Sequence, residues 1–258
     1  FQYTVLELNT AVKPWALQHL LDSGHEQVIY IDPDICLYRP LSEVTGLLQS
    51  GADIVFTPHL LSPLSDDCRP TELDIRRAGT YNLGFCAMRN TPNTHAYLRW
   101  WQGKLRHDCV VAVDKGIFVD QSWMDLVPGL FENVAILRHP GYNVAYWNLA
   151  ERTVAESDGQ FAVNGQPLAF FHFSGFNPER PEGVSKHQNR FTFENLGATS
   201  RRLFEGYARA VLDNGAVKYK RLPYGFDRYD NGTPITAAER LRFRRSEERR
   251  VGKECLRL

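Results

Sequence analysis

The stretch Val28-Ile29-Tyr30-Ile31-Asp32-Pro33-Asp34 decides how this chain folds. Its first four residues form a short apolar run, which is typical of a strand buried on both faces of a mainly parallel sheet. Ligands of open α/β sheets bind at the carboxyl ends of strands. Two carboxylates in alternate positions, with Pro33 keeping Asp32 extended, can converge on one hard cation. The stretch therefore predicts an acidic ligand site, although a solvated turn in which an Asp caps a helix would produce the same short motif.

Strand-like and helix-like patterns alternate on both sides of this stretch, which predicts a three-layer α/β sandwich with a mainly parallel central sheet. Asn9 or Thr10 is the expected cap of a helix that runs to Gly24 and has Pro14 in its first turn. The other expected elements are strands at 53–57, 81–89 and 134–137, helices at 41–48, 71–78, 91–107, 119–126 and 200–213, and a hairpin of 161–163 with 168–173 around Asn164-Gly165.

The composition excludes several classes of protein. With 258 residues, 43% hydrophobic and 23% charged, the chain is close to an average soluble domain and can bury a large core. Its 30 basic and 30 acidic residues argue against a basic face for nucleic acid, and no apolar run is long enough for a membrane span. The cysteines form no CxxC pair, which favours free thiols in a reducing cytoplasm; they are Cys36, Cys68, Cys86, Cys109 and Cys255.

Both ends of the chain are unusual. Structured-looking sequence follows directly on Phe1, so we expect an upstream part of the protein. Residues 245–255 resemble the in-frame translation of a common sequencing adapter, and a solvated charged helix end is the alternative interpretation. We therefore predict that residues 245–258 are not native. The remainder has 25 basic and 27 acidic residues and is slightly acidic.

Three further motifs carry candidate chemistry. His172 follows an apolar strand and precedes Gly175, so it can complete a metal site, although a lone His is more often a hydrogen-bonded structural residue. Gly84, in Asn82-Leu83-Gly84, interrupts a strand, which often marks close approach of a ligand or of backbone. Asp120-Gln121 opens a helical segment, where the Asp could cap the helix or bind a hydroxyl group.

In this order, the Asp-x-Asp, Asn-x-Gly, Asp-Gln and His-x-x-Gly-x-x-Pro motifs resemble those of GT-A glycosyltransferases, most closely the retaining class with glycogenin and the bacterial lipopolysaccharide galactosyltransferases. The resemblance covers residues 5–180. It implies that Asp32, Asp34 and His172 bind a divalent metal, Mn²⁺ or Mg²⁺. It also implies that Asn82 and Asp120 hold the sugar or the acceptor, that Gln121 lies near the anomeric carbon opposite the leaving group, and that Lys13 and Gly175 lie at the diphosphate.

The chain departs from the family pattern at two places. The late motif of the family usually has Lys before its Pro, where this chain has Asn177, and we assign the missing charge to Lys186. Pro33 replaces a small residue. The departures indicate a divergent bacterial relative and leave retention or inversion of configuration open. GT-A enzymes of this kind start with a βαβ unit for the nucleotide base, so residues 1–244 alone are expected to bind a nucleotide-sugar weakly compared with an N-terminally extended version.

The resemblance implies transfer of a sugar from a nucleotide-sugar donor to a glycan, lipid-linked or protein acceptor, in cell-surface polysaccharide or lipopolysaccharide synthesis. The expected location is the cytoplasm, including the inner face of the membrane. Asn143 is assigned to a substrate hydroxyl and Trp147 to stacking on a sugar, with packing as the alternative for the ring. We divide the chain into a catalytic domain (1–184), a helical extension (185–244) and the tail (245–258).

Two other functions fit parts of the same pattern. A haloacid-dehalogenase-type phosphatase also places Asp-x-Asp after an apolar strand, with Asp32 as the nucleophile. That class normally continues with Thr or Val and then Leu, where this chain has Ile35-Cys36-Leu37, and it needs an acidic pair late in the chain. The third possibility is a non-catalytic module that binds a nucleotide-sugar.

Overall fold

The central sheet has the strand order β1-β4-β3-β7 in the computed structural model, which describes residues 1–255, with side chains of the last helix described as far as Ser246. These strands are β1 (Gln27–Ile31), β4 (Tyr81–Arg89), β3 (Ile54–Pro58) and β7 (Val134–Ile136). Strands β1, β3 and β7 run in one direction and β4 runs against them between β1 and β3. The α/β class is confirmed. The central sheet is mixed and not mainly parallel: three of its four described strands run in one direction, but β3 with β7 is the one parallel pair of neighbours, and β4 pairs antiparallel with both β1 and β3.

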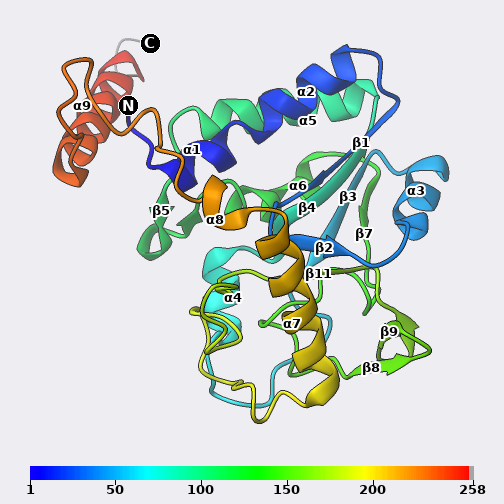
Figure 1. The fold of residues 1–258 in the computed structure, drawn as a ribbon. Helices are drawn as coiled ribbons and strands as arrows, with labels where there is room; N and C mark the ends of the chain where they lie inside the picture. The colour runs from blue at the N-terminus through cyan, green and yellow to red at the C-terminus, as the bar shows by residue number, and fades with distance from the viewer. Residues whose placement is uncertain (256–258) are drawn as a thin grey trace.

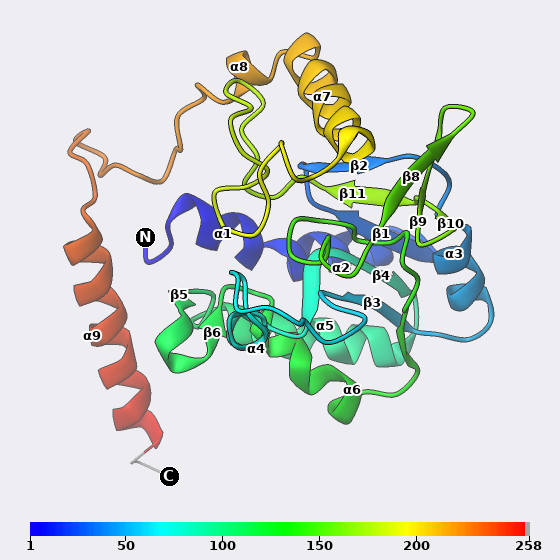
Figure 2. The same ribbon diagram turned by 90° about the horizontal axis from the view of Figure 1, so that it is seen from below.

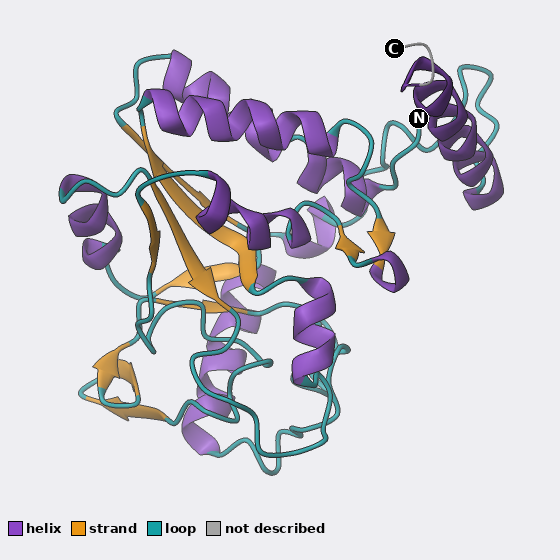
Figure 3. Cartoon of the chain, turned by 180° about the vertical axis from the view of Figure 1, so that it is seen from behind, coloured by secondary structure: helices purple, strands orange, loops and turns teal. Residues whose placement is uncertain are grey.

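Helices cover both faces of the sheet (Figures 1 and 3). Helices α2 (Lys13–Asp22) and α5 (Pro92–Leu105) pack together on one face, and α3 (Ser42–Gln49) lies on the other. Successive residues of a strand face opposite sides, so Cys86 and Met88 of β4 pack with α2 and α5, while Phe85 packs with α3. Because β4 is buried on both faces, the predicted three layers are present.

The first helical segment differs from the expectation. Helix α1 (Val5–Ala11) begins after Thr4, not at Asn9 or Thr10, and α2 follows after a single residue. Thr4 and Glu7 form a capping box: the Thr4 side chain accepts from the Glu7 backbone, and the Glu7 carboxylate accepts from the Thr4 backbone at 2.8 Å. This reciprocal pair of hydrogen bonds explains why the helix begins earlier in the chain than expected. Pro14 lies in the first turn of α2, as predicted.

The predicted hairpin is correct at its turn and wrong in its second strand. Asn164 and Gly165 have φ values of 48° and 76° and join β9 (Gln160–Val163) to β10 (Gln166–Pro167). The following segment forms β11 (Phe170–His172), which pairs antiparallel with β2 (Ile35–Leu37), directly after Asp34. Strand β2 was not predicted, because three residues carry no periodic signal.

The other expected elements are present with small shifts. Thr71 caps α4 (Glu72–Ala78) through a capping box with Asp74. The turn expected at 119–126 is a 3-10 helix (Ser122–Leu126) that continues into a short helix. The remaining elements are β5 (Val111–Ala112), a 3-10 turn (Val113–Lys115), β6 (Ile117–Phe118), α6 (Val127–Leu130) and β8 (Val154–Ser157), which pairs with β9.

Three helices follow the sheet domain. Helix α7 (Ala198–Asp213) packs onto β11, where the ring of its Phe204 lies 5.3 Å from that of Phe171. Helix α8 is short (Ala216–Tyr219), and α9 (Ala237–Cys255) stands apart beside the N-terminus (Figure 2). Over the described residues, every helix is too short or too polar to cross a membrane.

The predicted non-native tail begins inside α9, which continues past Arg245 without a break. Residues 256–258, and the side chains of 247–255 including Cys255, lie outside the described part of the chain. The division at residue 245 and the boundary at 184 stay predictions. The other four cysteines are free thiols, as expected.

Candidate functional site

Three predicted metal ligands come together at the carboxyl end of β1. Asp32 and Asp34 follow the strand, and the β2–β11 ladder places His172 opposite Ile35, the residue after Asp34. His172 Nε2 lies 3.1 Å from Asp34 Oδ1 and 4.0 Å from Asp32 Oδ2. One ligand atom from each of these three residues lies within 4.8 Å of the others. The short β2–β11 ladder therefore brings the Asp-x-Asp motif together with His172, which is distant in the sequence.

The donor set suits a divalent cation. Carboxylate oxygens with one imidazole nitrogen are ligands that Mn²⁺ accepts readily. Burial alone would raise the pKa of Asp34, but the hydrogen bond and charge of His172 outweigh burial and lower it. Asp34 is thus ionised at neutral pH and available as a ligand.

Asn82 fixes the orientation of the His172 ring. The backbone N–H of Gly84 donates to Asn82 Oδ1 at 3.2 Å, so this atom is the carboxamide oxygen and can only accept. His172 Nδ1 lies 3.2 Å from the same oxygen, so Nδ1 carries a proton, and Nε2 is the ring nitrogen that faces the two aspartates and would coordinate a cation held between them. A hydrogen bond behind the ring of this kind is typical of metal-binding histidines.

Gly84 makes room for that ring. A Cβ atom at Gly84 would lie 2.8 Å from His172 Nδ1 and closer still to the neighbouring ring carbon. The predicted close approach at this glycine is therefore that of the His172 side chain. The glycine and the asparagine of the Asn-x-Gly motif both serve the histidine.

We expect Gly84→Ala to lower Mn²⁺ affinity about 10- to 100-fold, because the added methyl group displaces the imidazole from the cluster. Titration calorimetry with Mn²⁺ measures the change. Gly103→Ala is the matched control: it lies in α5, and a Cβ there would meet nothing within 4 Å. Equal Mn²⁺ affinity of the two variants would show that Gly84 does not position His172.

Lys13 lies behind the acidic cluster and not in open contact with solvent. Its Nζ lies 3.0 Å from Asp120 Oδ2 and 3.5 Å from Asp32 Oδ1, and it donates to the Leu83 carbonyl at 3.0 Å. Burial would lower the pKa of Lys13, but the carboxylates of Asp120 and Asp32 outweigh burial and raise it. Burial raises the pKa of Asp120, and the ammonium group opposes that rise. Lys13 is therefore a buried cation with Asp120 as its counter-ion.

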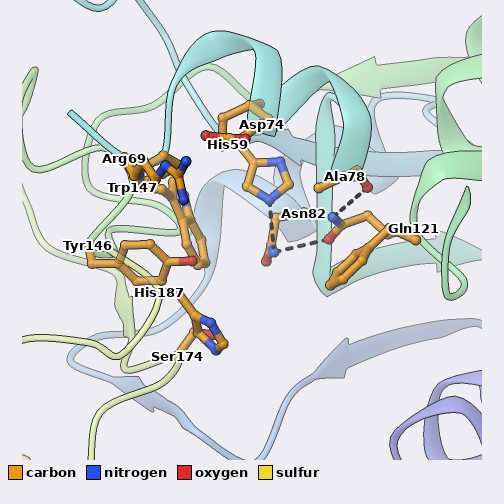
Figure 4. Close-up of a pocket in the computed structure, with 13 residues that line it drawn as sticks. His59, Arg69, Asp74, Ala78, Asn82, Gln121, Tyr146, Trp147, Ser174 and His187 are labelled. Carbon is orange, nitrogen blue, oxygen red and sulfur yellow. Dashed lines mark hydrogen bonds between the residues drawn. The ribbon is translucent and has the colours of Figure 1, made fainter. Parts of the chain in front are cut away.

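A pocket of about 400 Å³ is lined in part by Asn82 (Figure 4), which also contacts His172 of the cluster. Asn82 belongs to its wall, and the Trp147 ring in the same wall lies 5.2 Å from the His172 ring. The lining combines aromatic and polar side chains. It includes His59, Arg69, Asp74, Asn82, Gln121, Tyr146, Trp147, Ser174 and His187.

Gln121 is held rigidly in this wall. Its Oε1 accepts from Asn82 Nδ2 at 3.2 Å and from the Leu83 backbone at 3.0 Å, and its Nε2 donates to the Ala78 carbonyl at 2.9 Å (Figure 4). Asn82 Nδ2 also faces His59 Nε2 at 3.3 Å. Asn82 thereby uses its amide hydrogens within the protein, which suits positioning better than direct sugar contact.

The other predicted residues occupy less direct positions. Asp120 is buried against Lys13. Asn143 is also buried, and its Nδ2 donates a hydrogen bond to Thr57 Oγ1 at 3.0 Å. Neither residue belongs to the pocket lining. Gly175 has a φ of 71°, and a Cβ there would lie 2.5 Å from Ser185 Oγ, so this glycine admits the following segment. Lys186 is exposed, and its backbone N–H donates to Gly175 at 3.1 Å.

His59 was not recognised from the sequence, although its position could have revealed it. It follows β3 directly, so it also stands at the carboxyl end of a strand. Burial lowers its pKa to about 4, so the ring is neutral at pH 7. Its Nδ1 faces the Thr80 carbonyl at 3.3 Å, which leaves Nε2 as the acceptor for Asn82.

Comparison with known proteins gives no activity. No protein-family model matches the chain. It is 32% identical over 174 residues, 64% of its length, to the uncharacterized protein YfnF of Bacillus subtilis (strain 168), and this region covers 55% of YfnF. It is 31% identical over 102 residues, 39% of its length, to the uncharacterized protein YfnD of the same organism, covering 33% of YfnD. The chain thus spans about half of one curated relative and a third of the other.

Among solved structures, the chain is similar to a glycosyltransferase involved in the glycosylation of the major capsid of PBCV-1. The TM-score is 0.43 at 10% identity, over 68% of this chain and 74% of that one. A backbone similarity of this degree says nothing about activity. The chemistry of the site has to come from its own residues.

Proposed function

We propose that the chain forms the catalytic core of a metal-dependent glycosyltransferase, which moves a sugar from a nucleotide-sugar donor to a hydroxyl group of an acceptor. The convergence of Asp32, Asp34 and His172 beside a pocket with polar and aromatic walls carries this proposal. The motif order Asp-x-Asp, Asn-x-Gly, Asp-Gln and His-x-x-Gly supports it as a family resemblance.

The cluster is assigned to the leaving diphosphate. A divalent cation, Mn²⁺ or Mg²⁺, held by the three side chains would neutralise negative charge on the departing group. The protein's own part is to hold the ligands in place: Asn82 orients His172, and Lys13 keeps a positive charge behind Asp32. Lys13 is thereby assigned an indirect role at the diphosphate, because its ammonium is already engaged by protein groups.

The pocket is assigned to the sugar. Gln121 presents its carboxamide in a fixed orientation, which suits the position near the anomeric carbon. The Trp147 ring packs edge-on against His59 and His172, so it forms a wall and is not free to stack with both faces. Asp120 and Asn143 act from behind this surface, and Lys186 beside Gly175 is the candidate for added charge at the diphosphate.

The wider setting of the reaction is also a proposal. The acceptor would be a hydroxyl group of a glycan, a lipid-linked glycan or a protein, in the synthesis of a cell-surface polysaccharide or lipopolysaccharide. The site would then work in the cytoplasm, including the inner face of the membrane. The free thiols Cys36, Cys68, Cys86 and Cys109 are compatible with a reducing compartment.

One assay tests the transferase activity. The protein, expressed with whatever its gene encodes ahead of Phe1, is incubated with Mn²⁺ and a panel of nucleotide-sugars, and release of nucleoside diphosphate is measured. We expect release with at least one donor, loss of release in Asp34→Ala, and loss on removal of the metal with a chelator.

The same assay separates the alternatives. Phosphate release from small phosphomonoesters would instead identify a phosphatase with Asp32 as nucleophile. In the structure, the third member of the cluster is the imidazole of His172 and not an acidic residue, which speaks against that class. Binding of a nucleotide-sugar without release of either product would identify a non-catalytic module.

A further inference from the structure

Arg190 makes an extensive set of contacts that none of the functions above explains. Its side chain is 5% exposed. Nε and Nη2 donate to the carboxylate of Asp66 at 2.8 to 3.1 Å, and Nη2 also donates to the carbonyls of Cys68 at 2.9 Å and Pro70 at 3.1 Å. One guanidinium group thus binds three positions of a single loop far away in the sequence.

The preceding residue binds the same loop. Asn189 Oδ1 accepts from the backbone N–H of Arg69 at 2.6 Å, and the backbone N–H of Asn189 donates to the Arg69 carbonyl at 3.2 Å. Both polar backbone groups of Arg69 are therefore occupied by one residue. Asn189 and Arg190 together hold residues 66–70 along their length.

The two segments joined in this way are opposite parts of the pocket rim. Arg69 and Pro70 line the pocket from one segment, and Ser174 and His187 line it from the other (Figure 4). The absence of a side chain at Gly175 lets the 185–187 segment fold back against the strand end that carries His172. The Arg190 contacts therefore connect the 66–70 loop to the segment that carries His187, and both line the pocket.

The contacts are more extensive than those of an ordinary surface pair. The geometry is bidentate, and hydrogen bonds from Arg190 are the main cause that lowers the pKa of Asp66 to about 2, so the pair remains ionic at any physiological pH. Within the described chain, the buried Nη1 of Arg190 finds no partner. Burying an unpaired donor costs stability, so the hydrogen bonds that Arg190 does make have to offset this cost.

We propose that Arg190 is a positioning residue, which ties the 185–190 segment to the 66–70 loop and so sets how tightly the pocket holds the donor sugar. The proposal rests on the proposed function for the identity of the ligand. The proposed role of Arg190 does not involve the metal cluster, because Arg190 contacts none of the three cluster side chains in the described part of the chain.

Arg190→Ala is expected to raise the KM for the best nucleotide-sugar of the panel about tenfold, while kcat changes less than twofold and Mn²⁺ affinity is unchanged. Asp66→Ala is expected to reproduce most of the rise in KM, and the double variant to add little, because both substitutions remove the same contact. Arg190→Lys keeps the positive charge but loses the bidentate guanidinium contact with Asp66. It should therefore restore only part of the affinity for the nucleotide-sugar. A fall in kcat at constant KM would overturn the positioning role.

Hydrogen exchange of the backbone amides of residues 60–70 tests the contact without any substrate. Arg190→Ala is expected to speed exchange there about tenfold. Arg202→Ala is the control, because Arg202 Nε and Nη2 both donate to Glu156 Oε2, at 2.8 and 2.6 Å, away from the pocket lining. Unchanged exchange in Arg190→Ala would overturn the proposal even if the enzyme is active. Faster exchange in Arg190→Ala, in a protein that turns over no nucleotide-sugar, would support the positioning role of Arg190 and overturn the proposed function.

Discussion

Asp34→Asn is expected to weaken Mn²⁺ binding by about 100-fold or more and to abolish release of nucleoside diphosphate. Asn keeps the size of the side chain but removes the negative charge that His172 and a cation both face at this position. Loss of a ligand should exceed the 10- to 100-fold effect typical of residues that merely support a ligand. Titration calorimetry gives the affinity, and the rise of melting temperature on adding Mn²⁺ gives a second measure.

The control for this experiment is Asp114→Asn, which removes the same charge from an exposed position outside the cluster. It should bind Mn²⁺ like the unchanged protein. If Asp34→Asn also keeps full affinity, the three side chains do not form a metal site, whatever activity the protein shows.

Lys13→Met is expected to cost about 3–5 kcal/mol of the free energy of unfolding, because it leaves the buried carboxylate of Asp120 without its counter-ion. Urea denaturation followed by circular dichroism measures the loss. Lys115→Met removes an exposed lysine and should change stability by no more than about 0.5 kcal/mol.

A double variant shows whether the loss of stability in Lys13→Met comes from the unpaired Asp120 carboxylate or from lost packing of the lysine side chain. Lys13→Met with Asp120→Asn removes the stranded charge and should recover most of the stability. A double variant as unstable as Lys13→Met would mean that the lost contacts of the lysine stem matter, and not the unpaired carboxylate.

The parts of the site that the sequence predicts are those encoded locally. The apolar run 28–31 and the two aspartates after it specify a strand and its polar end within seven residues. The starts of α4 and α5 are equally local: the helices expected at 71–78 and 91–107 begin after Thr71 and Thr91, whose side chains cap them. Motif order then brought His172 into the same candidate site, and the structure places it there.

The parts that could not be predicted depend on pairings between distant segments. The three residues of β2 acquire their role from β11, and no pattern within Ile35–Leu37 announces that partner. The family resemblance assigned Lys13 to the diphosphate, and its contact with Asp120 cannot be read from the sequence. The contacts of Arg190 with Asp66 depend likewise on how two loops meet, since neither loop has a periodic pattern.

The β2–β11 ladder also has a consequence for the order in which the protein is made. His172 is synthesised roughly 140 residues after the acidic pair, and α7, which covers β11, later still. At ordinary rates of translation this interval lasts on the order of 10–30 seconds. During that time β2 lacks its partner strand, so a metal site that needs His172 would form only after β11 has been made.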